Sequence, residues 1–155
     1  MPGYVQEALT RFHHSMRKQN DHPHKHAIPV FGTTIQYAKP ADTSGLLHDK
    51  NKKYVQQVTE TFLYYARAVD PTMLVTLSAI ASSQAAPTTA TMDKVKYFLD
   101  YSATHPDAIL TYRASDMVLA VHSDASYLSE PKTRSRAGGQ FFYQTALKTH
   151  QIMGR

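Results

Sequence analysis

The spacing of apolar residues along the chain changes from a helical period to a strand-like period near residue 107. Before that point, apolar residues recur every three or four positions in three stretches. This pattern predicts helices at about 50–69, 71–84 and 89–104. Because the connections between them are short, we expect the three helices to pack together as one helical unit.

Cap and breaker residues mark the ends of these helices. Asp49 is expected to cap the first helix, since a short acceptor side chain can bind the free backbone N–H groups there. Asp70-Pro71 separates the first helix from the second. Thr88 or Thr89 begins the third, and His105-Pro106 ends it because the residue before proline avoids the helical region.

The N-terminal region has weaker patterns. The apolar spacing within residues 2–16 predicts a short amphipathic helix, which must dock on another part of the protein to be stable. Residues 17–46 contain three prolines and two glycines, which favours an extended surface arm. Within that arm, the run 33–38 is a candidate edge strand.

After residue 107 the apolar residues alternate, which predicts a small antiparallel sheet with strands at 108–112, 117–124 and 137–143. The middle strand has apolar residues on both faces, so we expect it to be central and covered on both sides. The last strand would leave an open edge that is able to pair with another chain.

These patterns predict an α+β fold in three parts. An N-terminal helix and Pro/His-rich arm occupies 1–46, a helical connection unit occupies 47–106, and a β-hairpin segment with a divergent tail occupies 107–155.

Composition narrows the class of protein. The chain is 42% hydrophobic and 19% charged, as expected for a globular protein, and its net charge of +5 favours a nucleic-acid partner. It has no cysteine, which excludes disulfides and thiolate metal sites. No signal peptide or membrane-spanning segment is visible, so we expect no membrane partner and an intracellular location, cytoplasmic or nuclear.

Asp124 is the sharpest catalytic candidate, since it ends an apolar strand. Nucleases that use two metal ions hold them with several carboxylates on different elements. The alternative is an aspartate that simply begins a turn. The only acid after it is Glu130, six residues on in a predicted loop, so a complete two-metal cluster is not expected.

Two further groups of residues are open to a functional or a structural interpretation. Lys132, Arg134 and Arg136 form a basic cluster that is able to contact phosphates, or a solvated hairpin end. The histidine-rich tract at 13–26 suggests a metal site, although a solvated arm explains it better. His122 lies beside Asp124 on one strand face and is able to take part in chemistry there, although a semi-buried structural histidine explains it better.

Three blocks of the sequence, in order, resemble the end of the reverse transcriptase and the start of the RNase H in copia-type retrotransposon polyproteins. The blocks are YVQQVTETFLYYARAVDPTMLVTLSAIAS, APTTATMDKVKYFLDYSATHPDAILTYR and LAVHSDASYLSEPKTRSRAGGQFFY. They are similar to the family's helix pair with an Arg-Pro-Asp corner, its following helix, and its SDADWAGD…RRSTSGY hairpin. The resemblance covers residues 55–143.

The resemblance implies that Asp124 is the first metal-binding carboxylate of an RNase H site, with Mg²⁺ or Mn²⁺ as the cofactor and an RNA–DNA hybrid or DNA as the partner. Arg134 and Arg136 match the family's basic turn. The family's tryptophan after the Asp-Ala pair is replaced by Ser126-Tyr127. The chain contains no YVDD-like polymerase motif, and its sequence after Phe142 no longer resembles the family.

We therefore expect a truncated copia-type reverse transcriptase/RNase H fragment from a transposable element, without catalytic activity of its own and without a stably bound metal. The alternative is a basic nucleic-acid-binding module, or a protein-interaction module, derived from a retroelement.

Overall fold

The computed structural model of the chain describes residues 1–25, 42–130 and 134–145. The chain divides into two compact units, a helical unit that ends at Leu110 and a hairpin unit that begins at Thr111. The four helices and the two-stranded antiparallel sheet of the described residues confirm the predicted α+β class.

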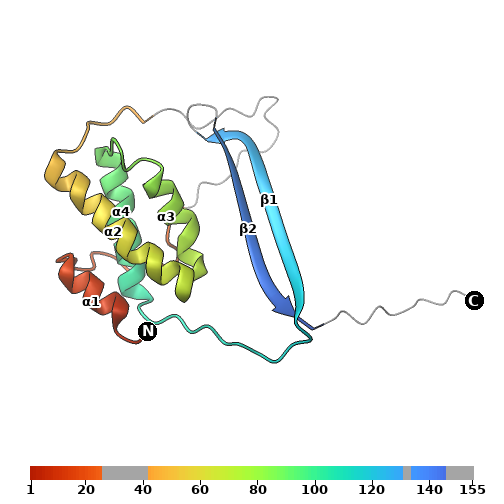
Figure 1. The fold of residues 1–155 in the computed structure, drawn as a ribbon. Helices are drawn as coiled ribbons and strands as arrows, with labels where there is room; N and C mark the ends of the chain where they lie inside the picture. Colours follow the sequence, from red (N-terminus) through yellow and green to blue (C-terminus); the bar gives the residue numbers. More distant parts are fainter. Residues whose placement is uncertain (26–41, 131–133, 146–155) are drawn as a thin grey trace, which may run out of the picture. The chain divides into compact units, whose positions relative to one another are not determined.

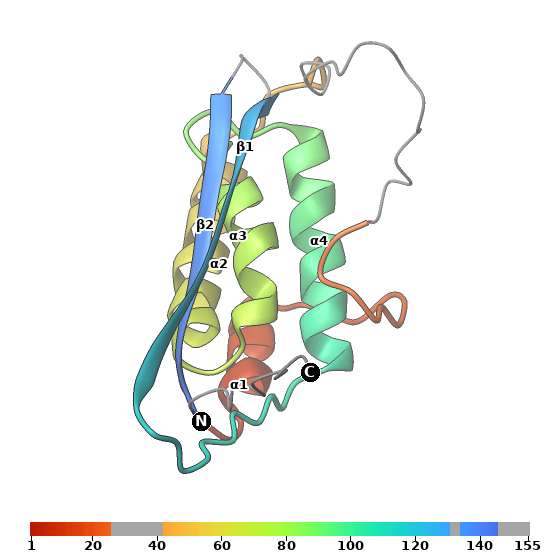
Figure 2. The ribbon, with the colours of Figure 1, turned by 90° about the vertical axis from the view of Figure 1, so that its right-hand side faces the viewer.

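The described part of the helical unit contains four α-helices and one short 3₁₀ helix (Figures 1 and 2). α3 and α4 run side by side in Figure 2, and α1 lies near one end of them. The elements are α1 (Tyr4–Arg11), α2 (Asp49–Ala68), η1 (Pro71–Met73), α3 (Leu74–Ala81) and α4 (Thr89–Thr104).

The core of this unit is apolar and takes residues from every helix. Phe62 of α2 meets Phe98 of α4 edge to face, with ring centroids 5.1 Å apart, and neither side chain is exposed to solvent. α1 contributes Val5 and Ala8 to the same core, so the short N-terminal helix docks as its pattern predicts. Burial of these side chains, rather than helix propensity, is what stabilises a helix of eight residues.

The helix ends confirm most of the predicted caps. Thr88 precedes α4 and forms a reciprocal capping box with Thr91, and the Asp70 carboxylate accepts a hydrogen bond from the Thr72 backbone N–H at the start of η1. The predicted cap at Asp49 is wrong: His48 occupies the cap position, without a side-chain bond, and Asp49 is the first helical residue. An acidic side chain in the first turn still stabilises the helix, because its negative charge lies near the positive end of the helix dipole.

The predicted helix at 71–84 is divided and shorter. It begins with η1 and continues as α3, which ends at Ala81 rather than at residue 84. Its apolar residues Leu77 and Ile80 are buried as predicted.

The arm that follows α1 is less extended than its composition predicts. Asn20 and Pro23 are buried. Asn20 donates from its side-chain amide to the Tyr97 carbonyl (3.2 Å) and from its backbone N–H to the Thr104 hydroxyl (3.1 Å). These bonds hold residues 14–25 against the helical unit, because a polar chain can pack where its backbone groups find partners. The predicted edge strand at 33–38 lies outside the described residues.

The hairpin unit consists of β1 (Val118–Glu130) and β2 (Arg134–Gln144), paired antiparallel. The sheet of the described residues has two strands rather than about three, since 108–112 is not a strand. The side chains of Ile109 and Tyr112 there are almost fully exposed, so nothing fixes an extended partner strand.

The two faces of the hairpin differ in polarity. The register puts Leu119, Val121, Phe141 and Tyr143 on one face, and His122, Asp124, Gln140 and Arg136 on the other. The four residues on the apolar face are all exposed. The expectation that β1 is covered on both sides is wrong, because Val118 on one face and Leu119 and Val121 on the other are 41%, 58% and 52% exposed. Among the described residues β1 pairs with β2 alone. Ala120 and Phe142 share the face of His122 and Asp124, so that face is mixed rather than wholly polar.

No helix in the described ranges is long and apolar enough to cross a membrane.

Candidate functional site

Asp124, the predicted catalytic residue, lies in the middle of β1 and is exposed. The expectation that it ends the strand is wrong, because β1 continues to Glu130. Its Cα partner on β2 is Gly138. One carboxylate oxygen accepts a hydrogen bond from the backbone N–H of Ala125 at 2.8 Å. A Cβ added to Gly138 would meet no atom within 4 Å, so the space opposite the carboxylate is open.

His122 lies two residues before Asp124 and on the same face of the hairpin. It is exposed rather than semi-buried, and its ring stacks on Phe142 with centroids 5.2 Å apart. Within the described ranges no group of three or more His, Cys, Asp and Glu side chains comes close enough to hold a metal ion. Asp124, the one residue that the sequence predicts to bind a metal ion, therefore belongs to no such group among the described residues.

The described residues of the predicted basic cluster, Arg134 and Arg136, lie in the first three residues of β2. Arg136 is the Cα partner of Ser126, and Arg134 is the Cα partner of Glu130. Since side chains at i and i+2 share a face, Arg136 lies on the same face as Asp124, diagonally across the strand pair. Lys132 lies outside the described residues. The register therefore brings the predicted metal-binding residue, Asp124, and one predicted phosphate-binding residue, Arg136, onto the same face.

A second polar cluster, in the helical unit, has no counterpart in the sequence analysis. Asp100 of α4 is only 3% exposed. Its Oδ1 accepts hydrogen bonds from His14 Nε2 (2.8 Å) and from the Arg17 backbone N–H (3.1 Å). Its Oδ2 accepts one from Arg17 Nη2 (3.1 Å). The Asp100 carboxylate thus accepts hydrogen bonds from three groups, which satisfies a buried side chain that can only accept.

The turn after α1 brings these donors to Asp100. His13 adopts a positive φ of 50°, and its N–H binds the Thr10 carbonyl (3.0 Å) while the His14 N–H binds the Leu9 carbonyl (3.0 Å). These two bonds form a Schellman motif, which usually uses glycine at the position of His13. The turn reverses the chain, so that His14 and Arg17 reach a helix more than 80 residues away in sequence.

The signal for this cluster was present in the sequence. Asp100 lies beside Phe98 and Leu99 and close to Ser102, on the part of α4 that faces the core. A carboxylate at such a position requires charged or donor partners, because burial of an unpaired carboxylate is very costly. What the sequence does not contain is the identity of those partners, which depends on how α1 docks.

Comparison of the chain with protein-family models, with curated proteins and with solved structures finds no match.

Proposed function

We propose that this chain is a segment of a copia-type retroelement polyprotein that spans the joint between reverse transcriptase and RNase H. The helical unit corresponds to the connection, and the hairpin corresponds to the first two strands of the RNase H sheet. The function of the hairpin is to present Asp124 and its basic neighbours to an RNA–DNA hybrid. The chain alone does not cleave that hybrid.

The observation that carries this proposal is the hairpin register. It supports a first catalytic acid on β1, since Asp124 lies opposite Gly138 on an open face that also holds Arg136. A hybrid-cleaving site needs a divalent ion at the acid and cations near the phosphate. In this proposal Asp124 binds the divalent ion and Arg136 contacts the phosphate, both on the same face of the hairpin.

The other face of the hairpin also supports the proposal. Leu119, Val121, Phe141 and Tyr143 leave an apolar face exposed, and neither outer edge is paired with another described strand. Isolated two-stranded hairpins are marginally stable at best in water. A hairpin of this kind is suited to a larger sheet, in which further strands and a helix cover it.

Cleavage of an RNA–DNA hybrid tests the role of Asp124. One carboxylate holds Mg²⁺ weakly, because this ion is usually shared among several ligands. We expect negligible hydrolysis at millimolar Mg²⁺ or Mn²⁺ by the purified chain. Hydrolysis that persists through purification and disappears in Asp124→Asn would refute the statement that the chain alone is inactive.

Salt dependence of binding tests the basic residues. If Arg134 and Arg136 contact phosphates, replacing both with glutamine should reduce the slope of log K against log salt by about 2 on a duplex. Lys50→Gln with Lys53→Gln removes the same charge from the exposed surface of α2 and is the matched control. Anisotropy with a labelled hybrid measures both. Equal slopes for the two double variants would contradict the assignment.

The derivation from a retroelement has its own test, which is the coding sequence on either side read in all frames. The proposal expects a paired-aspartate polymerase motif upstream and further RNase H acids downstream. Flanks that encode an unrelated, intact gene would overturn it.

A further inference from the structure

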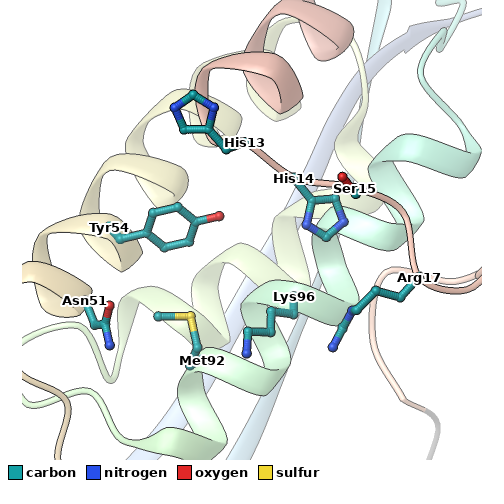
Figure 3. Close-up of a pocket in the computed structure, with 8 residues that line it drawn as sticks. All are labelled: His13, His14, Ser15, Arg17, Asn51, Tyr54, Met92 and Lys96. Carbon is teal, nitrogen blue, oxygen red and sulfur yellow. The ribbon is translucent and has the colours of Figure 1, made fainter.

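A pocket of about 370 Å³ opens on the helical unit, between the turn after α1, the start of α2 and the first half of α4 (Figure 3). This volume is near the lower end of the range for small-molecule sites, roughly 300 to 1,000 Å³. Its lining residues are His13, His14, Ser15, Arg17, Asn51, Tyr54, Met92 and Lys96.

The lining of this pocket has one sign of charge. Arg17 and Lys96 are cationic, two histidines accompany them, and no Asp or Glu is among the eight lining residues. Figure 3 shows His14, Arg17, Lys96 and the hydroxyl of Tyr54 arranged around the same space. The acid that contacts this group, Asp100, is buried beneath His14 and Arg17. Asp100 offsets the charge of Arg17, so the excess positive charge of the lining comes from Lys96. Concave walls with an excess of one charge favour a ligand of the opposite charge, here an anion.

Two of the lining residues, His14 and Arg17, are held in place before any ligand arrives. Asp100 binds the His14 ring and both the backbone and the guanidinium of Arg17, which reduces the conformational freedom that binding would otherwise remove. The Tyr54 hydroxyl donates to the Phe12 carbonyl at 3.4 Å. Burial raises the pKa of Tyr54 above its ordinary value, and the bond to Phe12 orients its hydroxyl.

We propose that this pocket binds a phosphate group, either free or carried by a small molecule such as a nucleotide. A phosphate has more acceptor oxygens than a carboxylate, and the pocket offers more donors than a carboxylate would use: a guanidinium, an ammonium, a hydroxyl from Ser15 and an amide from Asn51. The volume leaves room for a group attached to the phosphate. The site lies within the helical unit and is independent of the function proposed for the hairpin.

Calorimetric titration of the full chain with inorganic phosphate, at constant ionic strength, tests the proposal. Lys96→Gln is the informative variant, because Lys96 is exposed and makes no bond to Asp100, so the fold should be kept. We expect phosphate affinity to fall by about tenfold, the loss of one charge-assisted hydrogen bond. Lys53→Gln removes the same charge from the exposed residue beside Tyr54, outside the pocket, and should leave affinity within about twofold.

Two comparisons complete the test. Titration with adenosine monophosphate and with adenosine separates the sources of the phosphate: tighter binding of the monophosphate than of inorganic phosphate identifies a nucleotide, and equal binding identifies the free ion. Both results support the site. Adenosine binding as tightly as its monophosphate, equal losses in Lys96→Gln and Lys53→Gln, or no phosphate binding at about 10 mM, far weaker than typical ligand affinities, would overturn it. Circular dichroism of each variant verifies that the helical unit is folded.

Discussion

The helical unit and the hairpin unit use similar apolar residues in opposite ways. In the helical unit, Phe62 and Leu99 are fully buried, whereas in the hairpin Phe141 is 70% and Leu119 is 58% exposed. The helical unit therefore contains the interactions that stabilise it, while the hairpin presents an apolar face that its own two strands cannot cover. A regular hydrogen-bonded strand pair is therefore not by itself a folded core.

Hydrogen exchange of the whole chain should give the largest contrast between the two units. Backbone amides in the middle of α4, such as those of Phe98 and Leu99, should exchange only through global unfolding. Those of β1 should exchange through local opening of a marginal hairpin. For an ordinary domain stability, the difference in rate is at least about a thousandfold. Mass spectrometry of peptic fragments measures it, and comparable protection in both units would show that the hairpin has a core.

Truncation of one phenylalanine in each unit should affect stability very differently. Phe62→Ala should lower the free energy of unfolding by about 3 to 5 kcal/mol, because it leaves a cavity between α2 and α4. Phe141→Ala, the matched change on an exposed side chain, should alter it by less than about 0.5 kcal/mol. Urea unfolding followed by circular dichroism measures both. A large loss in Phe141→Ala would mean that the apolar face of the hairpin is covered in solution.

The sequence predicts the helical unit better than the hairpin for a related reason. The stripe through Val55, Val58 and Phe62 specifies which side of α2 is buried, because helical periodicity and burial depend on the same residues. In the hairpin, alternation predicts that β1 and β2 are strands. It does not specify what covers them, so β1 was wrongly expected to be covered on both sides. The run at 108–112 is also apolar, and no described strand pairs with it.

For the candidate sites, the sequence predicts single residues better than their neighbours. Asp124 lies on a strand as expected, but the register that brings Arg136 to the same face comes only from the structure. The partners of Asp100 depend on a turn with a positive φ at His13, where glycine is usual. Because no glycine or other turn signal stands there, the sequence does not predict this turn.

Removing the charge of Asp100 should have the next largest effect on stability. Asp100→Asn should cost about 2 to 3 kcal/mol, because the buried bonds from His14 and the Arg17 backbone lose a charged acceptor. Asp93→Asn, on the exposed side of the same helix, should change stability by less than about 0.5 kcal/mol. Urea unfolding at neutral pH compares the two variants. Equal effects would mean that the segment after α1 does not depend on Asp100 for its position.

The smallest predicted effect concerns acid stability and Asp42, which precedes α2 and contacts the start of α4. The hydrogen bonds that the Ser44 hydroxyl and then the Thr88 hydroxyl donate lower the pKa of Asp42 from 3.8 to about 2. A carboxyl group whose pKa is lower in the folded state stabilises the fold when it is ionised. This contribution is complete above the unfolded pKa and is lost as the pH falls from about 4 to about 2.

Asp42→Asn removes the titration, so the variant's unfolding midpoint in urea should fall less steeply than that of the wild type across this window. Asp107→Asn, another exposed acid of the helical unit, should keep the wild-type slope. Parallel slopes for Asp42→Asn and the wild type would mean that Asp42 is not bound to Ser44 and Thr88 in solution, and that α4 is capped by Thr88 and Thr91 alone.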